Sequence, residues 1–129
     1  MDKISEMLIT IKNAGTASKP NVLIPYSNLM HSIAECLSKK NYVGVVSKKT
    51  GKKDKPVLEI AISYEAGSPK IKSVERISKP SRRIYIKSKD IKNVKNGYGL
   101  LVISTPKGVL SGDEARKELV GGEVLFKVW

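Results

Sequence analysis

The chain has little of the chemistry on which most enzymes depend. It contains one histidine and one cysteine among 129 residues. His31 and Cys36 are five positions apart, which on a helix separates the two side chains by roughly 140°. Local geometry therefore does not pair them as a base and a nucleophile, and the same shortage of ligands excludes a metal site. We expect Cys36 to be a small buried residue and His31 a surface residue.

Disulfides and long apolar stretches are also missing. A single cysteine excludes an internal disulfide and suits a reducing compartment. No apolar stretch approaches the roughly 20 residues that a membrane helix needs, and the segment Met1–Glu6 resembles neither a signal peptide nor a transit peptide. We expect a cytoplasmic protein, and the hydrophobic share of 40% predicts a folded one.

Acidic side chains are scarce relative to basic ones. There are 24 Lys and Arg residues against 12 Asp and Glu residues, a net charge of +12. Such self-repulsion is typical of proteins that bind a polyanion. Between Lys70 and Lys107 there are 11 basic residues and only Glu75 and Asp90 to oppose them, so this segment is the predicted electrostatic footprint.

Apolar residues at helical spacing predict two helices in the first half. Residues 3–14 form one amphipathic pattern, and we expect Gly15 to end this helix at its C-terminal cap. Ser27 is the expected N-cap of a second helix whose apolar positions repeat from Leu29 to Leu37, with Lys39 and Lys40 near its C-terminal end. Asn41 is expected in the left-handed position that follows.

The first half also contains stretches with strand character. A short extended piece is expected at Val22–Ile24, and a long hairpin from Tyr42–Val46 and Val57–Tyr64. The loop between the hairpin strands, residues 48–56, contains five lysines and one aspartate. Charged loops of this kind are usually solvated tips, and nonspecific phosphate contact is the alternative.

Beyond the candidate boundary at Gly67–Pro69, the sequence predicts a sheet with one short helix. Ser111 and Glu114 have the spacing of a capping box, so this helix should run from about Gly112 to Leu119. The expected strands are 71–77, 83–87, 100–104 and 124–128. The predicted fold class is α+β with two lobes: an N-terminal α/β lobe (residues 1–66, two helices and about three strands) and a C-terminal, mainly antiparallel β lobe (residues 67–129).

Two polar segments of the second lobe are candidates for binding. Ser104–Val109, between an apolar strand and a helix start, offers hydroxyls, a lysine and a glycine backbone that can approach phosphates. It lacks the glycine and lysine spacing of a nucleotide-binding P-loop, and an ordinary polar connection is the alternative. Arg83, Tyr85 and Lys87 alternate along a strand and share one face, where they could contact a nucleic-acid backbone or base. Here the alternative is a cross-strand tyrosine with surface charges.

Residues spread over most of the chain resemble the bacterial small-subunit ribosomal protein S-eight family. The matching segments lie near the N-terminus, around Ser27, at Arg76–Pro80 and Arg83–Tyr85, and from Ser104 to Glu123. The last of these contains Ser104, Thr105, Lys107, Gly108, Val109, Glu114, Ala115, Arg116, Gly121, Gly122 and Glu123. The chain departs from the family pattern at Pro106, Asn28 and Lys127.

The resemblance implies a ribosomal RNA-binding protein with no catalytic activity, cofactor or metal. It implies binding to the central domain of small-subunit ribosomal RNA, through an irregular helix, early in assembly. It also suggests contact with neighbouring small-subunit proteins such as S-five, and repression of its own operon messenger RNA. The implied RNA-binding residues are Ser104, Thr105, Lys107, Gly108, Gly122, Glu123, Tyr85 and Arg83, and more weakly Lys12, Asn13 and Ser27.

Two alternatives follow from composition alone. One is a general basic RNA-binding or RNA-chaperone module outside the ribosome. The other is a nucleic-acid-processing enzyme, against which the sequence offers no acidic cluster able to hold Mg²⁺. Lys95, within the basic stretch but outside the Ser104–Glu123 segment, is expected to add only attraction common to all RNA sequences.

Overall fold

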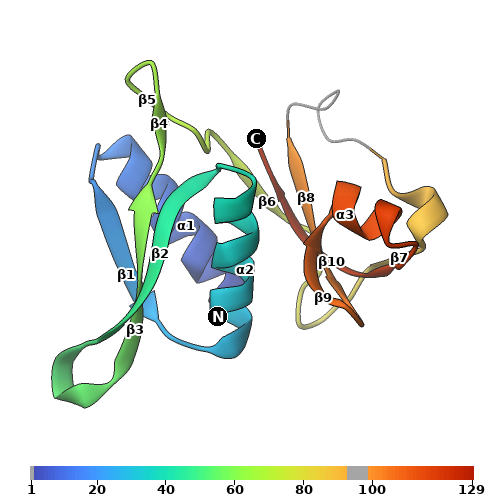
Figure 1. Ribbon diagram of the computed structural model, residues 1–129, viewed down its shortest axis with the longest axis horizontal. Helices are drawn as coiled ribbons and strands as arrows, with labels where there is room; N and C mark the ends of the chain where they lie inside the picture. The colour runs from blue at the N-terminus through green and yellow to red at the C-terminus, as the bar shows by residue number, and fades with distance from the viewer. Residues whose placement is uncertain (1, 93–98) are drawn as a thin grey trace. The chain divides into compact units, whose positions relative to one another are not determined.

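The computed structural model describes residues 2–92 and 99–129 (Figure 1). The chain divides into two compact units, Lys3–Lys72 and Ser73–Trp129, and Asp2 is grouped with the second unit. Gly67–Pro69, where the sequence placed a boundary, belong to a small hairpin of β4 (Tyr64–Glu65) and β5 (Ser68–Pro69) in the first unit. Gly67 has a φ of 81°, which glycine adopts without the steric cost of a side chain.

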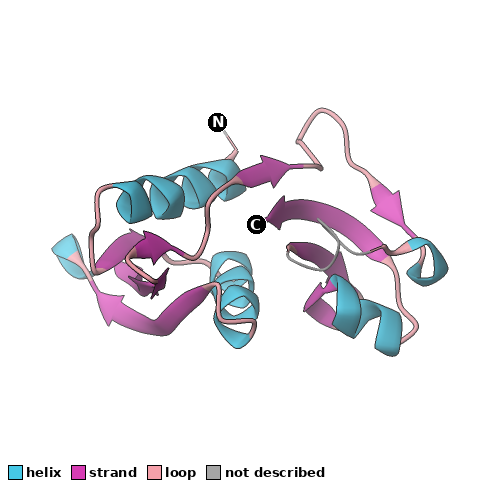
Figure 2. Ribbon diagram, turned by 90° about the horizontal axis from the view of Figure 1, so that it is seen from above, coloured by secondary structure: helices cyan, strands magenta, loops and turns pink. Residues whose placement is uncertain are grey.

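An antiparallel sheet of three strands in the order β1–β3–β2 forms the centre of the first unit. The strands are β1 (Asn21–Pro25), β2 (Val43–Thr50) and β3 (Pro56–Ile62). Burial alternates along β1, where Val22 and Ile24 are buried and Leu23 is exposed. One sheet face therefore forms the core with the helices α1 (Lys3–Thr16) and α2 (Asn28–Lys39), which Figure 2 shows beside the strands.

The first helix, α1 (Lys3–Thr16), is longer than predicted. Gly15 is not its cap but a buried residue of the last turn, where an added Cβ would lie 2.8 Å from the Cβ of Pro69. The left-handed position after the helix is occupied by Ser18, with a φ of 57°. Close packing against Pro69, and not a left-handed φ at the end of the helix, therefore explains why position 15 is a glycine.

The second helix, α2 (Asn28–Lys39), begins and ends as predicted. The Ser27 hydroxyl accepts a hydrogen bond from the Met30 amide at 3.1 Å, which satisfies one of the free N–H groups at the helix start. Asn41 has a φ of 64°, as expected for the residue that follows the helix. Cys36 is buried on its inner side.

The β2–β3 hairpin is longer than predicted. Strand pairing extends to Thr50 and Pro56, so Lys48 and Lys49 lie in β2 and not in a loop. The connection contains only residues 51–55, with a single 3₁₀ turn at Lys52–Asp54. Lysine has a low strand propensity, and here backbone pairing with the apolar strand β3 overrides it.

The second unit contains a five-stranded antiparallel sheet in the order β6–β10–β8–β9, with β7 also paired to β10. The strands β6 and β7 are shorter than predicted, and β9 was not predicted. Their bounds are β6 (Val74–Arg76), β7 (Tyr85–Ile86), β8 (Leu100–Thr105), β9 (Gly108–Ser111) and β10 (Gly122–Val128).

The helix α3 (Gly112–Lys117) packs on one side of this sheet, where Ala115 joins Ile91 and Ile103 in a buried cluster. The capping box of Ser111 and Glu114 is confirmed. Together the two units confirm the α+β fold class.

Candidate nucleic-acid interface

Ser104–Val109 is a tight β-hairpin and not the strand-to-helix loop that the sequence suggested. Thr105 pairs with Gly108 across β8 and β9, which leaves only Pro106 and Lys107 in the turn. Gly108 has a φ of 108°, a conformation that costs little only for glycine. Sequence reasoning missed β9 because its four residues show no alternation of apolar and polar side chains, and because they follow the turn directly.

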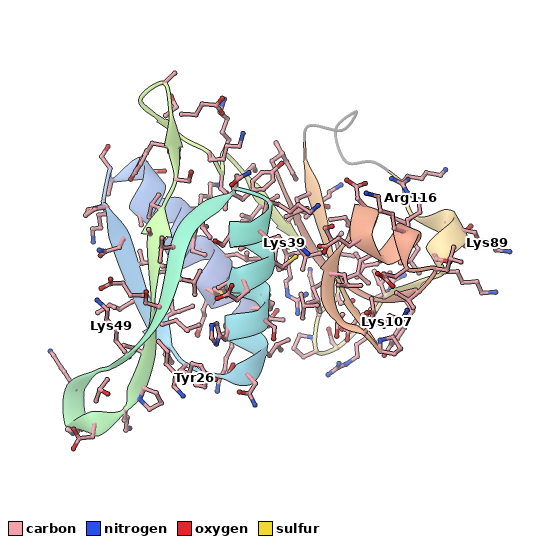
Figure 3. All side chains as sticks on the ribbon, viewed as in Figure 1. Tyr26, Lys39, Lys49, Lys89, Lys107 and Arg116 are labelled. Atoms are coloured by element: carbon pink, nitrogen blue, oxygen red, sulfur yellow. The ribbon has the colours of Figure 1, made fainter. Side chains whose placement is uncertain are left out.

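The Thr105 hydroxyl stabilises this turn. It donates a hydrogen bond to the Gly108 carbonyl at 2.8 Å and accepts one from the Lys107 amide at 3.1 Å. Lys107 lies at the end of the hairpin (Figure 3), with its ammonium 3.1 Å from the Glu118 carboxylate. Exposed ion pairs of this kind contribute little, so Lys107 can exchange Glu118 for a phosphate at low cost.

Strand register brings three predicted site residues into one row. Glu123 of β10 lies opposite Ser104 of β8 on one edge and opposite Tyr85 of β7 on the other. Ile103 packs against α3, and successive strand residues alternate faces. The row therefore lies on the sheet face away from α3.

Two members of this row are available for contacts with a ligand. The Tyr85 side chain is 68% exposed. The Ser104 hydroxyl has no hydrogen-bond partner among residues 2–92 and 99–129. A free hydroxyl and an exposed ring, on the two sides of Glu123, suit a surface that presents 2′-hydroxyls and base edges.

Glu123 is paired with Arg83. A guanidinium nitrogen of Arg83 lies 3.2 Å from a Glu123 carboxylate oxygen, and the side chains are 60% and 16% exposed. The pair orients Arg83 beside the row and offsets the negative charge of Glu123. A carboxylate held in this way can still accept a hydrogen bond from a sugar hydroxyl.

Gly121 and Gly122 are required by the sheet itself. A Cβ on Gly122 would lie 2.0 Å from the Ser104 carbonyl oxygen, and one on Gly121 would lie 2.2 Å from the Ile86 carbonyl oxygen. The pair allows β7 and β8 to approach β10 closely. Gly122 was predicted as a binding residue. In the structure it allows β8 and β10 to pack closely enough for the row to form.

Ser78 supports the site and was missed by sequence reasoning. It is fully buried, and its hydroxyl accepts a hydrogen bond from the Ile84 amide at 2.9 Å and donates one to the Ile84 carbonyl at 3.2 Å. These bonds close the loop that presents Arg82 and Arg83. Serine in a polar segment is ordinarily exposed, so nothing in the sequence indicated its burial.

The remaining predicted residues belong to the first unit. Lys12 and Asn13 are exposed on α1, and the Ser27 hydroxyl is engaged as the N-cap of α2. The structure thus brings together Ser104, Thr105, Lys107, Gly108, Gly122, Glu123, Tyr85 and Arg83, which we call the β8–β10 surface, while Lys12, Asn13 and Ser27 lie in the other unit. Lys95 lies outside the described residues.

Positive charge is distributed over both units. Lys70 and Lys72 belong to the first unit, so the basic segment 70–107 is not one surface. Residues 3–72 contain 12 basic and 5 acidic side chains, a net charge of +7, and the second unit with Asp2 has 12 and 7, a net charge of +5. Each unit can attract a polyanion.

Burial raises the pKa of the Tyr42 phenol above its usual value of 10.0, and the Lys70 ammonium partly offsets this.

Within residues 2–92 and 99–129, no three His, Cys, Asp or Glu side chains gather as metal ligands. In the same residues no helix is long and apolar enough to cross a membrane.

The fold and the charge define a small, strongly basic α+β protein of two units, in which Tyr85, Glu123 and Ser104 lie in one row on a sheet face beside Arg83. The sequence profile described as Ribosomal protein S8 matches residues 2–129. The chain belongs to this family, which confirms the resemblance seen in the sequence.

Individual relatives match over nearly the whole chain. It is 44% identical to the small ribosomal subunit protein uS8 of Erythrobacter litoralis over 128 residues, covering 99% of the chain and 97% of the relative. The protein of the same description from Mycoplasmopsis agalactiae is also 44% identical over 128 residues with the same coverage. That from Syntrophus aciditrophicus is 42% identical over 129 residues, again covering 99% and 97%. The chain thus belongs to a family of ribosomal structural proteins, which is not known to be enzymatic, and as a small-subunit protein it belongs to the cytoplasmic ribosome.

Proposed function

We propose that the chain is a structural constituent of the small ribosomal subunit that binds the central domain of small-subunit ribosomal RNA early in assembly. The β8–β10 surface is the main contact in this proposal. The single observation that supports it most is the row of Tyr85, Glu123 and Ser104 on one sheet face. Its relatives are named as small-subunit proteins.

The chemistry of the surface suits an RNA minor groove. The A-form minor groove is wide and shallow and displays 2′-hydroxyls. Short side chains on a flat sheet, such as Ser104, can exchange hydrogen bonds with these hydroxyls. Arg83, positioned by Glu123, and Lys107 at the hairpin turn can reach the flanking phosphates.

Each predicted residue has a distinct role in this proposal. Ser104 contacts a 2′-hydroxyl, Tyr85 stacks on an exposed base or sugar, and Arg83 and Lys107 contact phosphates. Thr105, Gly108 and Gly122 hold the backbone in place for these contacts, and Glu123 orients Arg83. Lys12, Asn13 and Ser27 provide a second, weaker contact from the first unit.

Two finer parts of the proposal concern partners. The same surface would bind the messenger RNA of its own operon where that RNA forms a similar helix, and so repress translation. In the assembled subunit the protein would contact neighbours such as S-five. The family resemblance motivates both parts. The messenger RNA contact also depends on the β8–β10 surface, whereas the contact with neighbouring proteins does not.

Chemical footprinting of small-subunit RNA with and without the chain tests the proposal. We expect protection confined to one internal helix of the central domain. Protection spread over unrelated helices would favour a general RNA chaperone instead.

Ser104→Ala provides a sharper test of the surface. Because this hydroxyl has no partner in the described part of the chain, its removal should leave the free energy of unfolding unchanged. Affinity for the protected helix should fall by about 1 to 3 kcal/mol, the cost of an unpaired polar group in the RNA. Affinity for an unrelated duplex should hardly change. Equal effects on both RNAs would remove Ser104 from the contact.

A further inference from the structure

The turn of the β2–β3 hairpin gathers the densest positive charge of the first unit. Residues 48–55 contain five lysines and one aspartate, so they supply +4 of the net charge of +7 in residues 3–72. The hairpin turn projects from its unit at the lower left of Figure 1. None of these lysines belongs to the β8–β10 surface, so the contacts proposed for that surface give them no role.

The lysines of the hairpin fall into two groups. Lys48 and Lys49, on β2, are held by neighbours: the Lys48 ammonium lies 4.1 Å from the centre of the Tyr26 ring, and that of Lys49 lies 3.0 Å from a Glu59 carboxylate oxygen. Figure 3 labels Tyr26 and Lys49 at the base of the hairpin. These contacts fix the base of the projecting segment.

The three lysines of the turn, by contrast, are exposed and have no ion-pair partner within residues 2–92 and 99–129. They are Lys52, Lys53 and Lys55. Asp54 lies between them and is exposed as well. Like charges held this close repel one another, and this repulsion is relieved when an anion binds.

The backbone of the turn holds these lysines in a defined arrangement. The Gly51 amide donates to the Lys55 carbonyl at 2.7 Å, and the Lys55 amide donates to the Lys52 carbonyl at 3.2 Å. Lys53 and Asp54 both have left-handed φ values, 56° and 57°. Such conformations cost free energy in residues other than glycine and cluster at functional segments.

From this geometry we infer that the β2–β3 turn is a phosphate-binding arm that contacts an RNA backbone through Lys52, Lys53 and Lys55. The inference rests on the proposed RNA-binding function and adds a contact that is separate from the β8–β10 surface. Phosphate contacts carry no sequence information, so the arm contributes affinity without sequence preference.

Three matched variants of the full chain test the arm. K52Q/K53Q/K55Q removes the three charges, K52R/K53R/K55R keeps them, and K3Q/K19Q/K72Q removes three charges from exposed lysines elsewhere in the same unit. Binding is measured to a central-domain fragment of small-subunit RNA and to an unrelated RNA duplex over a range of salt concentrations. Circular dichroism confirms that each variant is folded.

We expect the glutamine variant of the arm to lose about tenfold or more in affinity for both RNAs at low salt. Its slope of log K against log salt should become shallower by about 1 for each lysine that contacts a phosphate. The arginine variant should behave as the wild type, and the K3Q/K19Q/K72Q control should change the slope much less. If the slope of log K against log salt were equal in the K52Q/K53Q/K55Q variant and in the control, the proposed phosphate-binding arm would be overturned.

The result separates the two proposals. If the wild type binds the central-domain fragment selectively while the arm variant keeps its affinity and slope, the arm is wrong and the proposed function stands. If the wild type binds neither RNA, the proposed function fails and the arm fails with it.

Discussion

Gly122 lies directly against the backbone of Ser104, so closely that a Cβ on Gly122 would be 2.0 Å from the Ser104 carbonyl oxygen. The contact joins the middle strand of the second unit to the strand that presents the predicted RNA-binding hydroxyl. Because the obstacle is backbone and not a flexible side chain, the clash cannot be relieved without moving a strand. The glycine therefore controls both the sheet and the surface on it.

Gly122→Ala should lower the free energy of unfolding by about 3 kcal/mol or more, since the added methyl group must displace β8. Gly108→Ala is the matched control: its Cβ would meet nothing within 4 Å, so only the strained φ remains, at about 1 to 2 kcal/mol. Chemical denaturation measures both. A loss for Gly122→Ala no larger than that for Gly108→Ala would contradict the close approach.

Thr105→Val should weaken cognate RNA binding through the hairpin turn. The variant keeps the β-branched shape but loses the hydrogen bonds to Gly108 and Lys107, which should destabilise the chain by about 1 to 2 kcal/mol. Affinity for the cognate helix should fall by about 1 to 3 kcal/mol, with little change for an unrelated duplex. Thr105→Ser restores the hydroxyl and should recover most of both losses. An equal effect of Thr105→Val on both RNAs would show that the turn does not determine specificity.

The sequence predicted well those features that local patterns determine. Helix spacing, the Ser27 cap and the capping box of Ser111 and Glu114 depend on residues within a few positions of one another, and all three are confirmed. The α+β class follows from the alternation of such patterns.

Features that depend on distant residues were not predicted. Gly15 was expected as a helix cap, yet it is required by Pro69, far along the chain. Ser78 is buried because Ile84 folds back onto it. The row across β7, β10 and β8 requires the strand register, which no single segment contains. The residue pattern alone indicated Ser104–Val109 and the Arg83, Tyr85 and Lys87 face, and the family resemblance added the other site residues. The structure adds that the Thr105 hydroxyl holds the turn.

Ser78→Ala should destabilise the loop that presents Arg82 and Arg83. The variant removes the hydroxyl to which the Ile84 amide donates, and because Ser78 is fully buried the loss should be about 1 to 3 kcal/mol. Amide hydrogen exchange of Ile84 should accelerate, and RNA affinity should fall because Arg83 is no longer held beside Glu123. Unchanged exchange at Ile84 would argue against this role. Ser88→Ala, on the exterior 3₁₀ turn Ser88–Asp90, serves as a control without these bonds.

Tyr42 should make the stability of the chain fall at alkaline pH. Burial raises the pKa of its phenol in the folded state above the usual 10.0, so above that pH the unfolded chain releases the proton while the folded chain retains it. The folded state then binds more protons than the unfolded state, and the free energy of unfolding decreases as pH rises from about 10.0 toward the folded pKa, by at most about 1.4 kcal/mol per pH unit for one proton. Below pH 10.0 the phenol is protonated in both states, so the contribution of Tyr42 to the free energy of unfolding is fully present. Tyr42→Phe removes this group, so its stability should decline less steeply over the same interval, whatever the change in absolute stability. Denaturation at a series of pH values gives both curves, and parallel curves for the wild type and the variant would show that Tyr42 titrates alike in the folded and unfolded states.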